Sequence, residues 1–283
     1  MTLNSVIKNS SLEEVLIEPN KADINYWKDL WRFRELLWFL AWRDILVRYK
    51  QTIVGLAWSL IRPLLTLIVF TVVFGKLAAL PSNGIPYPVL VMAGLLPWQF
   101  FANSLSESSD SMISNANIIS KVYFPRLIIP ASSIVVSLVD FLISFFLMLV
   151  LMLWYGVYPT WRMIAIPLLL ILALATALGA GLWFAALSTR FRDFRYVVPF
   201  VVQFGLYISP VGFSSDVISV GWRFLYSLNP MVAVIDGFRW ALIAGDVTIY
   251  WPGFALSCCL IFLLLFTGVR HFRSMEKYFA DVI

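Results

Sequence analysis

Two ionisable side chains lie inside long apolar segments of this sequence, where charge is costly and chemically useful. Arg62 lies in the first such segment and Asp140 in the third. A charged residue at the centre of a bilayer costs about 2.5 to 3.5 kcal/mol, so each should face protein or water. Asp140 is suited to proton relay or to pairing with a cation, and Arg62 is either its partner or an anchor that reaches the membrane surface. We interpret Asp140 as a structural polar contact, because the apolar segments offer no His, Glu or Lys partner for a relay chain.

The motifs of the common enzyme classes are missing from the chain. It contains no G-x-x-x-x-G-K-[ST] run for ATP phosphates and no H-E-x-x-H, C-x-x-C or G-x-S-x-G motif. The single histidine, His271, lies near the C-terminus, and Cys258 and Cys259 are adjacent in an apolar run. We therefore expect no catalytic residue, no metal site and no cofactor in this chain. A conduit or carrier is favoured over a membrane-bound enzyme.

The composition is that of a membrane protein. Of the 283 residues, 61% are apolar and 13% are charged, against about 45–50% and about 25% in ordinary soluble domains. This excess excludes a soluble globular protein. The formal net charge of +5 could suggest nucleic acid, but in a membrane protein it reflects basic loops on the cytoplasmic side, so we expect no nucleic-acid partner.

We predict an all-α polytopic membrane protein with six transmembrane helices. The segments of spanning length cover residues 53–75, 86–106, 127–153, 164–187, 197–213 and 252–269. Sixteen Lys and Arg residues outside them fall on the side of the two termini and four on the other side, which places both termini in the cytoplasm. Residues 1–26 and 270–283 are then a cytoplasmic segment and a cytoplasmic tail, and 53–269 form the transmembrane domain.

Residues 27–52 form a different kind of segment. Apolar residues, including Trp27, Trp31 and Trp38, recur at steps of three and four, and basic residues gather opposite them. This pattern predicts an interfacial amphipathic helix along the membrane surface. A helix packed on a soluble subunit is the alternative, and the two arrangements are compatible.

Residues 214–250 are too polar for a simple span and too apolar for a free loop. Asn229 and Pro230 form a helix-start signal, with Asn as the cap and Pro at the first helical position. The helix expected over residues 231–244 is about 21 Å long, too short to cross a hydrocarbon core of about 30 Å. We predict short re-entrant helices between spans five and six, with a surface helix below the outer headgroups as the alternative.

Two stretches resemble a known family. The first covers residues 43–77 and begins with R-D-I-L-V-R-Y-K-Q-T-I-V-G-L-A-W-S-L-I-R-P. The second is L-N-P-M-V-A-V-I-D-G-F-R-W, residues 228–240. A shorter stretch, S-T-R-F-R-D-F at residues 188–194, supports the resemblance. They resemble the transmembrane permease subunit of ABC-2 type polysaccharide exporters, the group that serves O-antigen, capsule and teichoic acid export. The resemblance spans essentially the whole chain.

The resemblance implies partners, a location and a set of contact residues. It implies a homodimer of this chain in the bacterial inner membrane, two copies of a separate ABC ATPase that bind ATP and Mg, and a lipid-linked polysaccharide as substrate. Contacts with the ATPase are then expected at the interfacial helix and the cytoplasmic loops, at Arg43, Asp44, Arg48, Tyr49, Lys50, Lys121, Arg190, Arg192 and Asp193. Orientation by the positive-inside rule alone is the alternative role for these arginines.

Aromatic residues make up 16% of the chain and gather toward the predicted outer side. An aromatic belt at the membrane interface explains most of them. For the exporter, we expect sugar rings to stack on Trp98, Phe101, Tyr207 and Trp240. The alternative functions are an ABC-2 exporter of lipids or drugs and an ion-coupled carrier that uses Asp140. The carrier is disfavoured because the six segments show no inverted repeat.

Overall fold

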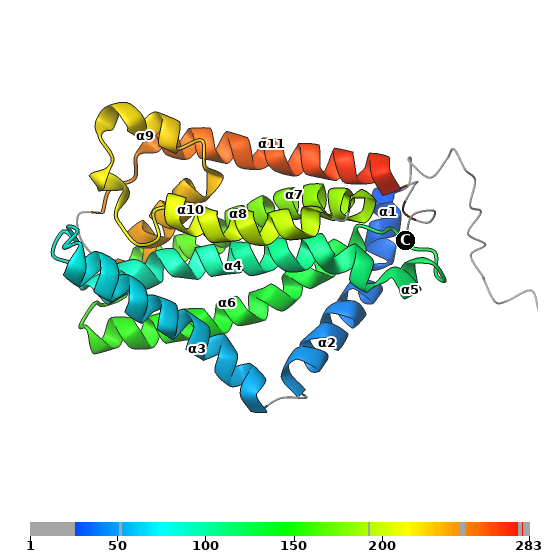
Figure 1. Cartoon of the computed structure of the whole chain (residues 1–283), viewed down its shortest axis with the longest axis horizontal. Coiled ribbons are helices and arrows are strands. Elements are labelled where there is room, and N and C mark those ends of the chain that lie inside the picture. The colour runs from blue at the N-terminus through cyan, green and yellow to red at the C-terminus, as the bar shows by residue number, and fades with distance from the viewer. Residues whose placement is uncertain (1–25, 51–52, 192, 244–246, 277–278, 280–283) are drawn as a thin grey trace, which may run out of the picture.

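The computed structural model describes residues 26–50, 53–191, 193–243, 247–276 and 279, and within these ranges the chain is helical and has no strand (Figure 1). The predicted N-terminal segment 1–26 lies almost entirely outside them. The helices in chain order are α1 (Tyr26–Arg32), α2 (Arg34–Lys50), α3 (Ile53–Phe70), η3 (Thr71–Leu77), α4 (Tyr87–Ser114), α5 (Ala116–Ile119), α6 (Ile128–Trp154), η4 (Trp161–Ala165), α7 (Ile166–Arg190), α8 (Phe194–Ile208), η5 (Ser215–Val217), α9 (Val220–Tyr226), α10 (Pro230–Leu242) and α11 (Trp251–Glu276).

Five helices in the described ranges are long and apolar enough to cross a membrane. They are Ala57–Leu77, Tyr87–Ser114, Ile128–Trp154, Trp161–Arg190 and Trp251–Glu276. The fifth predicted span, residues 197–213, is the helix α8, which has 15 residues and a length of about 22 Å. It ends at Ile208 because Ser209 is extended and Pro210 has no N–H for a helical bond.

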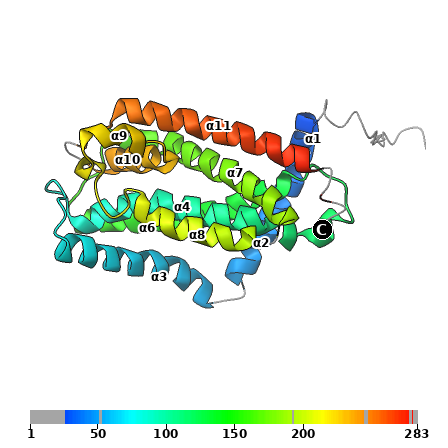
Figure 2. The ribbon, with the colours of Figure 1, turned by 45° about the horizontal axis from the view of Figure 1, so that its top comes forward.

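The helix α4 is the centre of the bundle. It packs against α6 and α7 along most of its length and also contacts α3, α8 and α10 (Figures 1 and 2). Its side chains from Val89 to Leu96 are almost completely buried. The helix α3 lies at the edge of the bundle and leaves Leu65, Ile68 and Val69 more than half exposed. An exposed apolar face on a spanning helix is suited to lipid or to another membrane-embedded chain.

The helix α4 is longer than the predicted span 86–106, which ended before several polar residues. These residues are tolerated in the helix, because three of their hydroxyls donate to its backbone: Ser106 to Ala102 O, Ser109 to Ser106 O and Ser111 to Ser108 O, at 2.7–2.8 Å. A serine hydroxyl can in this way find a hydrogen-bond acceptor inside a buried helix. The serine-rich stretch therefore belongs to α4, and the expected loop begins later.

The predicted interfacial helix is divided into α1 and α2 at Phe33. Residues 51–52 at its expected end lie outside the described ranges. Leu40 and Ala41 are buried toward the bundle, whereas Trp31 and Trp38 are 71% and 63% exposed. The tryptophan side of this segment thus faces away from the protein, as a helix at a membrane surface requires.

The helix α10 begins as the sequence predicts. The Asn229 side chain accepts the Met231 backbone N–H at 3.0 Å, and Pro230 is the first helical residue. The helix ends at Leu242, two residues before the expected end at Ala244, which lies outside the described ranges. It packs on α4, α7 and α11 and is buried along most of its length. The helix α10 is therefore packed among the other helices of the bundle.

Close packing of α7 on α11 gives a first prediction. A Cβ added at Gly179 would lie 2.8 Å from the backbone N of Leu265, so Gly179→Ala would force the two helices apart. We expect the free energy of unfolding to fall by about 1–3 kcal/mol, measured as a lower thermal midpoint in detergent. Gly221→Ala in α9 is the matched control, because a Cβ there meets no atom within 4 Å. Equal midpoints for the two variants would contradict this packing.

Candidate functional site

Four side chains from three helices meet at a charged centre, which we call the Arg48 cluster: Arg48, Tyr49, Glu107 and Asp140. Arg48 Nη1 lies 2.9 Å from Asp140 Oδ2, and Arg48 Nη2 forms an ion pair with Glu107 Oε1. The Tyr49 hydroxyl donates to Asp140 Oδ1 at 2.6 Å. One guanidinium thus bridges two carboxylates, which suits the fork of donors that arginine presents.

The Arg48 cluster ties the last turn of α2 to α4 and α6. Glu107 comes from α4 and Asp140 from α6, and Ser137 of α6 also donates to Glu107 Oε2 at 3.3 Å. Asp140 and Glu107 are 17% and 24% exposed. Two carboxylates at this depth repel each other unless a cation lies between them. Arg48 supplies that cation and so fixes where α2 meets the bundle.

The structure corrects the expectation that Asp140 has no acidic neighbour in the membrane helices. Glu107 lies just past the predicted end of the second span and therefore seemed to belong to a loop. Arg62, the other suggested partner of Asp140, forms no ion pair with it among the described residues. Arg62 and Asp140 instead line one cavity between α3, α4 and α6, whose other polar side chains include Arg48, Gln99, Asn103, Glu107 and Ser144.

The residues expected to contact an ATPase divide into two groups. Arg48 and Tyr49 turn inward to the Arg48 cluster, and Arg43 donates to Asp44 and to Asn115 at 2.8 Å each, so these side chains hold α2 in place. The other described members are exposed: Lys50, Lys121, Arg190 and Asp193. Arg192 lies outside the described residues. Only the second group leaves its charge available to a partner.

The four aromatic residues expected along a glycan pathway do not share one surface. Trp98 and Phe101 are 4% and 8% exposed, with ring centroids 5.4 Å apart. The Trp98 ring packs against Gly205 of α8. Tyr207 is 58% exposed, whereas Trp240 is half-buried below the Arg162 guanidinium, 5.3 Å from its ring. Tyr207 is therefore the one of the four that is open in this conformation.

Arg239 of α10 organises the opposite end of the bundle. Its guanidinium donates to three backbone carbonyls, those of Leu90 (3.3 Å), Val211 (2.9 Å) and Phe213 (2.7 Å). Arg239 is 3% exposed, and burial lowers its pKa. It fastens the turn after α8 to the beginning of α4. Arg239 is one of the four basic residues that the charge pattern places on the outer side, and the pattern does not predict this role.

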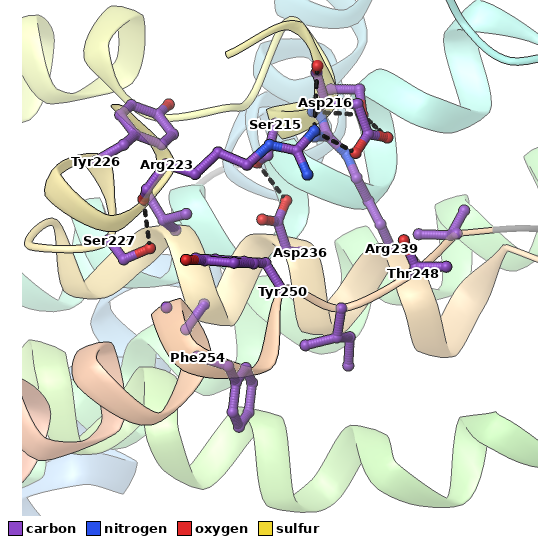
Figure 3. Close-up of a pocket in the computed structure, with 16 residues that line it drawn as sticks. Ser215, Asp216, Arg223, Tyr226, Ser227, Asp236, Arg239, Thr248, Tyr250 and Phe254 are labelled. Carbon is purple, nitrogen blue, oxygen red and sulfur yellow. Dashed lines mark hydrogen bonds and ion pairs between the residues drawn. The ribbon is translucent and has the colours of Figure 1, made fainter. Parts of the chain in front are cut away.

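A pocket that we call the outer pocket lies beside Arg239 (Figure 3). Asp236, one turn before Arg239 on α10, faces it, and Asp236 Oδ1 accepts the Ser215 hydroxyl at 2.7 Å. The pocket is completed by Asp216, Arg223, Tyr226, Thr248, Tyr250 and Phe254. Burial raises the pKa of Asp236 to about 6, and the charge of Arg239 opposes that shift. The sequence does contain one signal for this pocket: two charged residues, Asp236 and Arg239, lie in a short apolar helix.

Comparison with known proteins finds membrane transport proteins that are similar to most of the chain. The ABC-2 type transporter family matches residues 35–243. The O-antigen export system permease protein RfbA of Myxococcus xanthus is 27% identical over 259 residues, which cover 90% of this chain and 98% of that protein. A protein of the same name from Klebsiella pneumoniae is 29% identical, with 88% and 95% covered. The polysialic acid transport protein KpsM of Escherichia coli is 24% identical, with 83% and 91% covered.

The Arg48 cluster predicts unequal effects of removing its charges. Arg48→Gln leaves two carboxylates facing each other and should lower the free energy of unfolding by about 1–3 kcal/mol, allowing for partial solvent exposure. Asp140→Asn keeps the pair of Arg48 with Glu107 and should cost less than about 1 kcal/mol. Thermal unfolding in detergent measures both. Adding Asp140→Asn to Arg48→Gln should recover stability; a further loss would contradict the bridging role of Arg48.

Asp236 predicts a pH dependence of stability. Its pKa is about 6 in the folded chain against an ordinary value of 3.8, so the folded state binds this proton more tightly than the unfolded state. The contribution of Asp236 to the free energy of unfolding therefore favours the folded state below about pH 4 and is lost as the pH rises through 6. Between pH 5 and pH 7 the wild-type thermal midpoint should fall by at least about 2 °C more than that of Asp236→Asn. Asp193→Asn, which removes an exposed carboxylate, should retain the wild-type fall.

Proposed function

The chain belongs to the ABC-2 type transporter family, and from this membership we propose that it is the membrane-spanning subunit of an ATP-driven exporter of polysaccharide. The observation that carries the proposal is the near full-length similarity to proteins named for O-antigen export and polysialic acid transport. We infer a lipid-linked polysaccharide as the substrate. The chain itself performs no covalent chemistry.

We propose that ATP hydrolysis takes place in a separate ABC subunit, present in two copies that bind ATP and Mg. The sequence has no P-loop of its own. The exposed charges of Lys50, Lys121, Arg190 and Asp193 provide a polar surface for such a partner. Charged surfaces of this kind steer association and set the register of the two proteins.

We propose that two copies of the chain form the pathway between them, in a bacterial inner membrane with both termini in the cytoplasm. The exposed apolar faces of α3 and α8 supply surface for this pairing. The sixth crossing is made by α8 together with the turn that Arg239 holds. Tyr207 on α8 then faces the glycan first, and Trp98 reaches it only when α8 moves away from α4.

The proposed transport step is mechanical. Closure of the paired ATPases displaces α2, and the Arg48 cluster passes that displacement to α4 and α6. The pairing of Asp140 with Arg48 and Tyr49 supports a structural role for this carboxylate in transmission. An ion-coupled carrier would need Asp140 to release a proton to a pathway during each cycle.

The ATPase partnership is tested by purification. The chain is tagged at its C-terminus and extracted from its native membrane in mild detergent, and co-purified proteins are identified while ATP hydrolysis is assayed. We expect a P-loop ATPase in about equal amount, with activity lost when its Walker lysine is replaced. Purification without an ATPase under several mild conditions would contradict the exporter and favour the carrier that uses Asp140.

The substrate class is tested in cells of the source organism. Deletion of the chain should remove a polysaccharide from the cell surface and cause it to accumulate inside, as measured by glycan staining of intact and lysed cells. Unchanged surface polysaccharide with an intact ATPase partnership would point to the lipid or drug exporter instead.

The exposed charges predict where the ATPase binds. Lys121→Glu combined with Arg190→Glu should lower affinity for the ATPase more than about tenfold, because like charges then meet across the contact. The amount of ATPase that co-purifies measures this. Lys76→Glu is the matched control, since Lys76 is exposed at the other end of the bundle. An equal loss in the control would contradict the location of the contact.

A further inference from the structure

A groove lies between α1 and the C-terminal half of α11, and we call it the α11 groove. Figures 1 and 2 both show α1 beside this end of α11. The groove shares no residue with the Arg48 cluster or the outer pocket, and the proposed transport step gives it no role. Its volume is about 890 Å³, and the residues that line it are Trp27, Phe262, Leu265, Phe266, Val269, Arg270, Arg273 and Ser274.

One wall of the groove is a stripe along α11 that changes from apolar to basic. Phe262, Phe266 and Arg270 follow one another at intervals of four residues, so they lie on one side of the helix. The two phenylalanines are 61% and 64% exposed, and Arg270 is also exposed. From Phe262 to Arg270 the helix rises about 12 Å, close to the depth of about 15 Å of one hydrocarbon leaflet. The rings therefore lie at the level of acyl chains when the guanidinium lies at the level of headgroups.

The other wall of the groove comes from α1, which a cation holds in place. The Arg273 guanidinium lies over the Tyr26 ring, 4.5 Å from its centroid, and Tyr26 is buried. The next residue, Trp27, is 57% exposed and lines the groove. Indole rings favour the headgroup level of a membrane. The basic end of the groove is thus bordered by a side chain that is typical of the membrane surface.

The charge of the α11 groove indicates the class of its ligand. The described residues that line it include two arginines and no acid. Arg273 is engaged with Tyr26, whereas no ion pair or hydrogen bond joins the Arg270 guanidinium to another residue of the described ranges. Guanidinium groups bind phosphate through paired N–H donors. Basic pockets beside transmembrane helices bind the headgroups of anionic lipids.

We propose that the α11 groove binds one anionic phospholipid of the surrounding bilayer, with its phosphate on Arg270 and an acyl chain along Phe262 and Phe266. A lipid in this position contacts both α1 and α11 and therefore holds the interfacial segment against the last spanning helix. The inference does not depend on what the chain transports, because the ligand is a component of the membrane itself.

The proposal is tested by native mass spectrometry of the full chain in detergent, titrated with phosphatidylglycerol or phosphatidylcholine of identical acyl chains. The first phosphatidylglycerol should bind at least about fivefold more tightly than phosphatidylcholine, the factor expected for one basic side chain near an anionic lipid. Arg270→Gln should lower the affinity for phosphatidylglycerol about fivefold and leave that for phosphatidylcholine unchanged. Arg270→Lys, which keeps the charge, should retain most of the preference.

The apolar part of the groove has its own variant. Phe262→Ala combined with Phe266→Ala removes the surface for the acyl chain, so it should weaken the binding of both lipids by the same factor. Phe146→Ala is the matched control, because Phe146 of α6 is 67% exposed and does not line the groove. An unchanged affinity in the double variant would contradict the position of the acyl chain.

Arg195→Gln is the matched control for charge. Arg195 is exposed in the first turn of α8 and does not line the groove, so this variant should retain the wild-type preference. Equal affinity of the wild-type chain for the two lipids, or an equal loss in Arg195→Gln and Arg270→Gln, would overturn the proposal. Competition by glycerol phosphate at the lipid's own concentration would also overturn it, because the groove would then bind an anion without an acyl chain.

Discussion

A hydrocarbon environment offers no water to polar groups, and this constraint explains most of the specific contacts in the chain. A polar group left without a partner at membrane depth costs several kcal/mol. Three serines of α4, Ser106, Ser109 and Ser111, meet the requirement locally by donating to carbonyls of their own helix. Arg239 meets it by donating to three backbone carbonyls, those of Leu90, Val211 and Phe213. The polar residues of the bundle therefore set its geometry more sharply than the apolar ones do.

The same constraint links α2 to the transmembrane helices. Glu107 and Asp140 come from different helices, and their charges are compatible only with a cation between them. The guanidinium of Arg48 comes from a helix outside the five spanning ones. The helix α2 is thus attached to the core by charge as well as by the apolar packing of Leu40 and its neighbours. Because such a contact has a defined geometry, it is well suited to carrying movement between a partner protein and the bundle.

Local signals in the sequence predicted the elements better than the contacts between them. The Asn229 and Pro230 pair fixed the start of α10, because capping depends on adjacent residues alone. The end of α4 was missed because the polar residues there suggested a loop. In the structure, serine hydroxyls of this stretch donate to carbonyls of the helix, so the helix continues. That error placed Glu107 outside the membrane helices and hid its contact with Arg48. Asp236 was missed because its partner Ser215 comes from a distant turn, and spacing along the chain carries no information about such a pair.

The helix α4 connects the two polar centres of the structure. Its Leu90 carbonyl accepts from Arg239, and Glu107, about 25 Å further along the helix, binds Arg48. Pro97 lies between these two contacts inside the helix and removes one backbone hydrogen bond there. Proline is a common position for a helix to bend. A displacement of α2 that moves Glu107 must therefore either tilt α4 as a body or bend it at Pro97. If α4 tilts as a body, Leu90 moves with it and pulls on the turn that Arg239 holds. If α4 bends at Pro97, the half that contains Leu90 stays in place while the half that contains Glu107 moves.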